Sequence, residues 1–291
     1  MATATTTELR LREIEPADTA AAAQIVYRAF ARIHDRHRFP RDFPTLGAAT
    51  ALTSSFVAHP SIWGVVAEVD GRVVGSNFVD ERGPIRGVGP ITVDPDAQAQ
   101  GVGRRLMEAA LERSSGAAGT RLLQDSFNVA SLSLYASLGF EVREPVALMA
   151  GTPHSEPVDR VEVRRLEERD IEAAEALSLR VHGYQRTNEL RDALASDGLE
   201  PVVALRADRV VAYASTLGFF PAAHAVAETE ADMAALVAGS EGPVSFLLPT
   251  RQAELLRWSL DAGLRVLKPM TYMSIGQYRR PGGAWIPSVL L

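Results

Sequence analysis

Two closely spaced glycines, Gly101 and Gly103, lie where a predicted strand runs into a predicted helix. Glycine has no Cβ, so this turn can bend sharply and bring backbone N–H groups close to an oxyanion. The first N–H groups of a helix lack intrahelical acceptors, and the helix dipole adds partial positive charge there. The turn therefore predicts a cradle for a pyrophosphate. Its predicted members are Gln98, Gly101, Val102, Gly103, Arg104 and Arg105.

A second segment, residues 121–142, is typical of a strand, a helix and another strand. Asn128 has the side chain of a helix N-cap, and Gly139 suits the left-handed residue that follows a helix end. Around both segments, the pattern predicts strands at 8–14, 62–69, 72–80, 87–94, 120–126 and 140–150, and helices at 18–34, 46–59, 99–116 and 129–138.

The order of these features resembles the GCN5-related N-acetyltransferases (the GNAT family), which transfer an acetyl group from acetyl-CoA to an amine. The resemblance covers roughly residues 8–150 and rests on Val93-x-Pro95, Gln98-x-x-Gly101-x-Gly103, Asn128, Tyr135 and Leu138-Gly139-Phe140. It implies that acetyl-CoA is the cosubstrate. In the family the pantetheine arm pairs with the strand before the turn, here around Ile91 and Val93. A backbone N–H there could stabilise the developing oxyanion, and Asn128 is implied as a further cofactor contact.

The resemblance also implies a general acid and leaves the general base open. A tyrosine at the place of Tyr135 approaches the CoA sulfur and can donate a proton to the departing thiolate. Many members carry a glutamate on the fourth strand, but residues 87–93 contain no acid. Asp80, Glu81 and Asp125 could each remove the proton of the amine through water. Each is also typical of an ordinary loop carboxylate.

Residues 27–44 combine arginines and histidines with aromatic residues. The arginines could bind a carboxylate of the acceptor bidentately, although a solvated basic helix face is the favoured interpretation. They are Arg28, Arg32, Arg36, Arg38 and Arg41. His34 and His37 lie three residues apart and so on one helix face. Because no further ligand accompanies them, no metal site is predicted.

Length and composition bound the class of protein. At 291 residues, the chain is long enough for two domains of roughly 150 residues each. A net charge of −6 argues against a nucleic-acid binder. The absence of cysteine excludes disulfides, thiolate metal sites and a cysteine nucleophile. No basic leader or long apolar run is present, so a soluble, cytoplasmic protein without membrane contact is expected.

The chain contains a worn internal repeat. Residues 9–18 are echoed by 161–170, residues 65–75 by 202–212, and residues 138–149 by 262–273. Three matches in the same order indicate a tandem duplication. We therefore expect a first domain at 1–150, a linker at 151–158 and a second domain at 159–291.

The second copy of the repeat differs at the turn that corresponds to the predicted pyrophosphate cradle. Its equivalent, residues 225–235, has neither glycine, and three acids crowd the helix start: Glu228, Glu230 and Asp232. Acids there suit the helix dipole but repel a pyrophosphate. The second domain is expected to bind no CoA, to pack against the first and to wall off part of the acceptor site. The apolar tail at 285–291 is expected to dock on the first domain or on a neighbouring subunit.

The expected fold is α/β (α+β): two tandem GNAT-like domains, each a mixed, mostly antiparallel sheet flanked by helices. The expected function is direct transfer of acetyl from acetyl-CoA to a primary amine, most simply of a small molecule, by a monomeric pseudo-dimer of repeats or a homodimer. The alternatives are a non-catalytic acyl-CoA-binding sensor and an unrelated phosphate-ligand protein.

Overall fold

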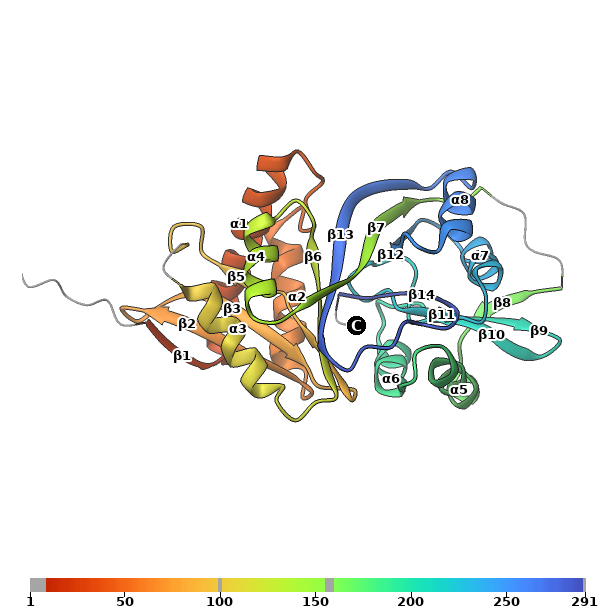
Figure 1. The fold of residues 1–291 in the computed structure, drawn as a ribbon, viewed down its shortest axis with the longest axis horizontal. Coiled ribbons are helices and arrows are strands. Elements are labelled where there is room, and N and C mark those ends of the chain that lie inside the picture. The colour runs from red at the N-terminus through yellow and green to blue at the C-terminus, as the bar shows by residue number, and fades with distance from the viewer. Residues whose placement is uncertain (1–8, 99–100, 155–159, 290–291) are drawn as a thin grey trace, which may run out of the picture. The chain divides into compact units, whose positions relative to one another are not determined.

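The computed structural model describes residues 9–98, 101–154 and 160–289, which form two compact units (Figure 1). The first unit comprises the chain up to Glu81 together with Arg86–Thr120, and the second comprises Arg82–Ile85 and the chain from Arg121 on. Residues 99–100 of the cradle, 155–158 of the linker, and 290–291 of the tail lie outside the described residues.

The sheet of the first unit is antiparallel. It runs β1 (Leu9–Glu13), β2 (Ile62–Val69), β3 (Arg72–Asp80) and β4 (Ile85–Val88), and β5 (Thr92–Val93) pairs separately with β3. The predicted strand at 87–94 is thus two short strands. Pro90 lies between them and has no N–H to donate to a ladder.

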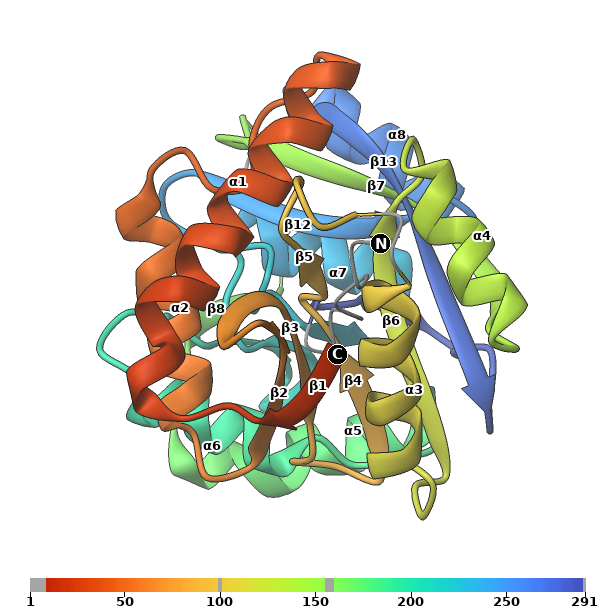
Figure 2. The ribbon, with the colours of Figure 1, turned by 90° about the vertical axis from the view of Figure 1, so that its left-hand side faces the viewer.

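Helices cover both faces of this sheet (Figure 2). α1 (Thr19–His37) and α2 (Leu46–Ala58) lie on one face, and α3 (Val102–Arg113) lies on the other. Two consecutive β3 residues show the alternation: the Asn77 amide donates to the Leu106 carbonyl of α3, while the Phe78 ring packs edge-on against Phe56 of α2.

The second unit contains a sheet in which the predicted repeats exchange their last strands. Its order is β6 (Gly119–Asp125), β13 (Arg265–Gly276), β7 (Glu141–Gly151) and β12 (Val244–Pro249). β7 ends the first repeat and β13 ends the second, and the two pair with each other antiparallel. α4 (Val129–Ser137) connects β6 to β7, and α8 (Ala253–Asp261) connects β12 to β13.

A second sheet of this unit runs β14 (Ala284–Ile286), β11 (Ala225–Ala227), β10 (Arg209–Ala214), β9 (Val202–Arg206) and β8 (Glu162–Arg165). α5 (Ile171–Val181), α6 (Thr187–Ala195) and α7 (Glu230–Ala238) belong to the same unit. β14 is the tail: Trp285 pairs with Val226 and is only 2% exposed. The tail therefore docks, as expected: β14 pairs in this sheet, and Trp285 also packs in a core cluster with Val146 and Leu148 of β7, which belong to the predicted first domain. Docking on a neighbouring subunit stays a prediction.

The repeat is visible in matching contacts at the start of each copy. The Arg12 guanidinium donates two hydrogen bonds to the Asp18 carboxylate, of 2.6 and 2.8 Å. The Arg164 guanidinium donates two to the Asp170 carboxylate, of 2.7 and 2.8 Å. Both aspartates close a short 3₁₀ turn, η1 (Pro16–Asp18) and η2 (Glu168–Asp170), and lead into the following helix. The paired guanidinium lowers the pKa of each carboxyl group.

Candidate cofactor and catalytic sites

The cradle predicted from the glycines begins α3. Gly101 adopts a left-handed conformation with φ at 78°, and the Arg105 N–H donates to the Gly101 carbonyl at 3.1 Å. The N–H groups of the first helical residues therefore have no acceptor within the helix. Gly101, the N-cap residue, has no side chain to cap them, whereas Thr45 and Asn128 cap α2 and α4. The N-terminus of α3 thus keeps donors for an anion.

The other predicted cofactor residues divide into core and surface. Val102 is buried, so its contribution to a ligand is its backbone N–H. Ile91 and Val93 pack half-buried against the same core as Val102. Three are exposed around the turn: Gln98, Arg104 and Arg105. Their charges and amide face solvent beside the helix N-terminus.

The loop before the cradle is fastened to α1. Arg28 donates to Asp94 at 3.3 Å and to Asp96 at 2.8 Å, and Arg32 donates to the Pro95 carbonyl at 3.2 Å. These arginines thus bind the chain's own oxygens. We assign them to positioning the turn rather than to an acceptor carboxylate.

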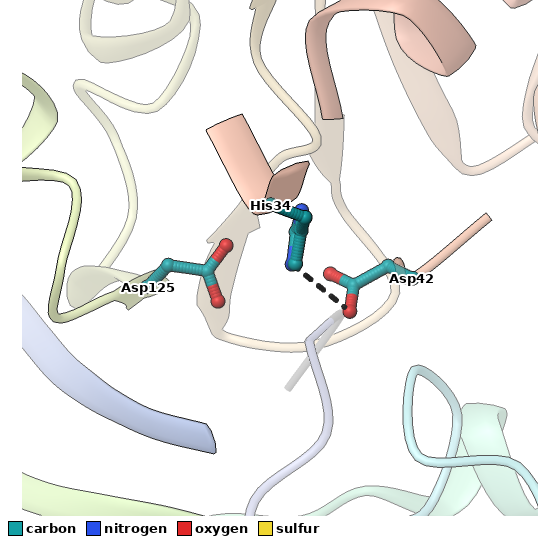
Figure 3. A group of neighbouring side chains, drawn as sticks. All are labelled: His34, Asp42 and Asp125. Atoms are coloured by element: carbon teal, nitrogen blue, oxygen red, sulfur yellow. Dashed lines mark ion pairs between the residues drawn. The ribbon is translucent and has the colours of Figure 1, made fainter. Parts of the chain in front are cut away.

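Two further basic residues of this segment, Arg41 and His34, are also engaged locally, whereas Arg36 and Arg38 are exposed. Arg41 pairs with Asp35 at 2.5 Å. His34 is fully buried, donates through Nδ1 to the Phe30 carbonyl at 2.8 Å, and has Nε2 3.5 Å from Asp42, as Figure 3 shows. His37, in contrast, is exposed. The two histidines therefore do not form a common site.

The equivalent helix start in the second copy, at α7, is closed by its own side chains. The Thr229 hydroxyl accepts from the Asp232 N–H at 3.1 Å, and Glu230 accepts from the Leu255 N–H at 2.7 Å. Asp232 is paired with Arg206 at 2.6 Å. Glu228 is likewise paired, with Arg180 and Arg209. The acids noticed in the sequence thus serve internal contacts.

In the second unit, the end of β6 places several polar side chains together. The Lys268 ammonium lies 2.6 Å from a carboxylate oxygen of Asp125, and these side chains are 1% and 8% exposed. The hydroxyls of Ser126 and Thr271 are 2.7 Å apart, and the Ser126 N–H donates to the Pro269 carbonyl at 3.2 Å. Asp125 therefore ends β6 as a buried, ion-paired carboxylate.

Tyr135 lies on the helix that follows. Its pKa is raised to about 12, chiefly by burial and to a smaller extent by the negative charge of Asp125, against a hydrogen bond with Ser131 that lowers it. Asn128 and Ser131 lie between Asp125 and Tyr135 in the chain: the Asn128 side chain accepts from the Ser131 N–H at 3.3 Å, and the Asn128 N–H donates to the Asp125 carbonyl at 2.9 Å. The structure thus brings Asp125, Asn128 and Tyr135 together.

The other predicted base candidates belong to the first unit. Asp80 is buried at the end of β3, where it pairs with Gly87. Glu81 makes a bidentate ion pair with Arg113, with contacts of 2.9 and 2.7 Å. A base role for Glu81 would require this pair to open.

Lys268 is the residue that the sequence interpretation missed. Its signal was present in the repeat, because Glu144 precedes Pro145 and Lys268 precedes Pro269. The structure shows the same reversal of charge, since Glu144 accepts from Arg251 at 2.6 Å.

Residues 60–142 match the family model described as an acetyltransferase (GNAT) domain. No curated protein matches the sequence. Among the described residues, no helix has the length and apolar character needed to cross a membrane.

Solved structures show that the fold similarity extends over nearly the whole chain. A candidate acetyltransferase from Pyrococcus horikoshii is 15% identical, with 95% of this chain and 94% of that chain covered and a TM-score of 0.69. A GCN5-related N-acetyltransferase from Sphaerobacter thermophilus is 15% identical, with 95% and 98% covered and a TM-score of 0.62. A tandem GNAT protein from the clavulanic acid biosynthesis pathway is 14% identical, with 97% and 100% covered and a TM-score of 0.55. The chain therefore has the fold of a tandem GNAT protein over nearly its whole length, and residues 60–142 match a GNAT acetyltransferase domain.

Proposed function

We propose that this protein is an acetyl-CoA-dependent N-acetyltransferase that acts on the primary amine of a small molecule. The observation that carries the proposal is the contrast between the two helix starts: α3 follows a left-handed glycine and has no side-chain cap, whereas α7 is capped by Thr229. Of these two helix starts, the one at α3 suits the pyrophosphate of CoA. The family match over the same residues supports the same ligand.

The proposed cofactor site consists of the backbone of the β5 strand and the α3 turn with the side chains around it. Its members are Ile91, Val93, Gln98, Gly101, Val102, Gly103, Arg104, Arg105 and Asn128. We further propose that the repeats divide at the linker 151–158, as 1–150 and 159–291. The compact units differ from these repeats because the final strands β7 and β13 are exchanged.

In the proposed reaction the amine nitrogen attacks the thioester carbonyl directly, the C–S bond breaks, and the thiolate takes a proton. Tyr135 suits the acid role because its raised pKa keeps the phenol protonated until donation. Of the three base candidates, we favour Asp125, because it ends the strand before the Tyr135 helix and its charge acts on that phenol. Like Glu81, it would have to release an ion pair, here with Lys268, before it could take a proton. Asp80 and Glu81 stay as alternatives, acting through water. Direct attack forms no acyl-enzyme, and the chain has no cysteine that could carry one as a thioester.

The test is a screen of amine pools with acetyl-CoA, following the release of free CoA with a thiol reagent. The protein has no cysteine, so every thiol detected is CoA. Turnover above the rate of spontaneous hydrolysis supports the proposal. CoA binding without turnover across the pools would contradict it and favour an acyl-CoA sensor.

A further inference from the structure

Arg121 is a buried cation that has no acid to neutralise it. Its residue is 3% exposed at the start of β6, and no carboxylate within the described ranges pairs with it. Arg186, the other buried arginine among the described residues of this unit, does have a partner: it pairs with Glu189 at 3.2 Å. Burying a charge is costly unless it is compensated. Arg121 therefore needs an explanation that packing does not supply.

Aromatic side chains surround the guanidinium and leave one edge of it poorly bonded. Its carbon lies 4.8 Å from the ring centre of Tyr184, 5.8 Å from that of Tyr278 and 6.0 Å from that of Tyr272. One terminal nitrogen donates to the Tyr184 hydroxyl at 2.7 Å. The other reaches the Gln277 carbonyl only at 3.4 Å, and Nε has no acceptor. The Nε edge is thus the edge that binds a carboxylate side-on.

A second buried donor without an acceptor lies on the same aromatic cluster. Trp285 Nε1 is unpaired, and its ring packs edge-on against Tyr272 at 5.1 Å and against His182 at 5.2 Å. Burial and nearby arginines, Arg121 among them, hold the pKa of His182 well below its ordinary value. The cluster therefore contains two buried N–H donors without an acceptor, Arg121 Nε and Trp285 Nε1, and the first of them carries positive charge.

We propose that Arg121 is the anchor of a carboxylate-binding subsite for the acceptor amine. One guanidinium with aromatic walls matches a monoanion better than a phosphate dianion. The ligand would replace the weak contact with Gln277, an exposed residue in the irregular segment between β13 and β14. This inference rests on the proposed acetyltransferase function.

The strand also indicates the length of the acceptor. Arg121 and Asp125 point to the same face of β6, because side chains alternate along a strand, and their Cα atoms are about 13 Å apart at about 3.3 Å per residue. An amine near Asp125 and a carboxylate at Arg121 thus belong to opposite ends of one molecule. The substrate class is an ω-amino acid rather than a compact α-amino acid.

The experiment compares matched amines that differ only in the carboxylate, namely 6-aminohexanoate against hexylamine and lysine against cadaverine. Binding is measured by saturation-transfer NMR and turnover by release of CoA, both in the full-length protein. We expect the carboxylate partner to bind at least about tenfold more tightly, the scale of a bidentate charged contact. Arg121→Met should abolish this preference and leave CoA affinity unchanged.

Arg143→Met is the matched control. Arg143 also stacks on Tyr278, at 5.0 Å, but it has its own acid, Glu141, at 2.6 Å. The control should keep the preference for the carboxylate. If Arg121→Met does not fold, Arg121→Lys is tested instead. It keeps the positive charge but not the planar guanidinium that binds a carboxylate through two N–H groups, so it should lose most of the preference for the carboxylate-bearing amine.

The outcomes separate this inference from the proposed function. Selective binding of 6-aminohexanoate without turnover supports the subsite and contradicts the acetyltransferase. Turnover of hexylamine and 6-aminohexanoate with equal efficiency and equal affinity overturns the subsite and supports the acetyltransferase. A preference that survives in both Arg121 variants overturns the role of Arg121.

Discussion

Lys268 and Asp125 form a buried ion pair, 2.6 Å apart, between strands of different repeats. Lys268 lies on β13, the last strand of the second repeat, and Asp125 ends β6 of the first. The second repeat therefore supplies a charge to the strand end where the proposed catalytic groups of the first repeat lie. The second repeat therefore contributes a particular charged side chain to this strand end, in addition to supporting the fold.

The first prediction concerns the stability of this pair. Lys268→Met leaves the Asp125 carboxylate buried without its cation and should lower the free energy of unfolding by about 3–5 kcal/mol. Adding Asp125→Leu should recover much of that loss. Urea unfolding measures both. The control is Arg169→Met, which removes the exposed ion pair with Glu167. If Lys268→Met and Arg169→Met lower the free energy of unfolding by equally small amounts, the buried pair has no special role in stability.

The second prediction is that one CoA binds per chain, because of the two equivalent helix starts that of α3 follows a glycine and has no side-chain cap, whereas that of α7 is capped by Thr229. Calorimetry should give a stoichiometry near one. Gly103→Asp should weaken CoA binding strongly by placing a carboxylate among the phosphates. Ala231→Asp makes the same change at the second residue of α7 and should not alter affinity. A stoichiometry near two would refute the assignment.

The third prediction concerns Tyr135. Tyr135→Phe keeps the ring and removes the proton donor, so turnover should fall by about 10²-fold or more, while CoA affinity changes little. Because its pKa is raised to about 12, the wild-type phenol should stay protonated, and it should cause no loss of activity below pH 11 or so. Wild-type turnover in the phenylalanine variant would reassign the residue to packing.

The fourth prediction concerns pH and stability. Asp18 has a lowered folded-state pKa, because Arg12 donates to its charged form. Its contribution should be fully present above the unfolded pKa, near 4, and be lost as pH falls through the lower folded value. Asp18→Asn should cost about 1–3 kcal/mol at pH 7 and flatten the fall in stability between pH 5 and pH 2. Urea midpoints across this range test it, and an unchanged slope would contradict it.

The fifth prediction concerns the tail. Buried Gln252 donates to the Trp285 carbonyl at 2.8 Å and accepts from the Trp285 N–H at 2.7 Å. Gln252→Ala should therefore cost about 1–3 kcal/mol, because buried backbone groups of β14 lose their partners. Hydrogen exchange should increase at residues 284–286. CoA affinity should not change, since the cradle belongs to the first unit. Unaltered exchange would show that β14 is held by other contacts.

Local sequence patterns predicted the helices and strands well, but they did not predict which strands lie side by side in a sheet. Asp18 and Asp170 could be recognised as matching helix starts, because capping depends on residues adjacent in sequence. Gly101 could be placed in a left-handed turn for the same reason. The insertion of β13 between β6 and β7 could not be predicted, since periodicity shows which face a strand buries but not which strand lies beside it.

The same limit applies to the candidate sites. Tyr135 and Asn128 were found because their spacing matches a family motif. Arg121 gave no signal as one residue of an ordinary strand, because its missing partner is a property of the folded core. Lys268 became interpretable only when its contact with Asp125 was known.

The exchange of β7 and β13 bears on the order of assembly during synthesis. β6 and β7 leave the ribosome long before β13, yet β13 must lie between them in the finished sheet. The first repeat cannot close its own sheet early, so its strand edges stay unpaired until about residue 276 has emerged. Contacts between segments so far apart in sequence also slow folding. Nascent chains stalled before β13 should consequently be the species that chaperones bind.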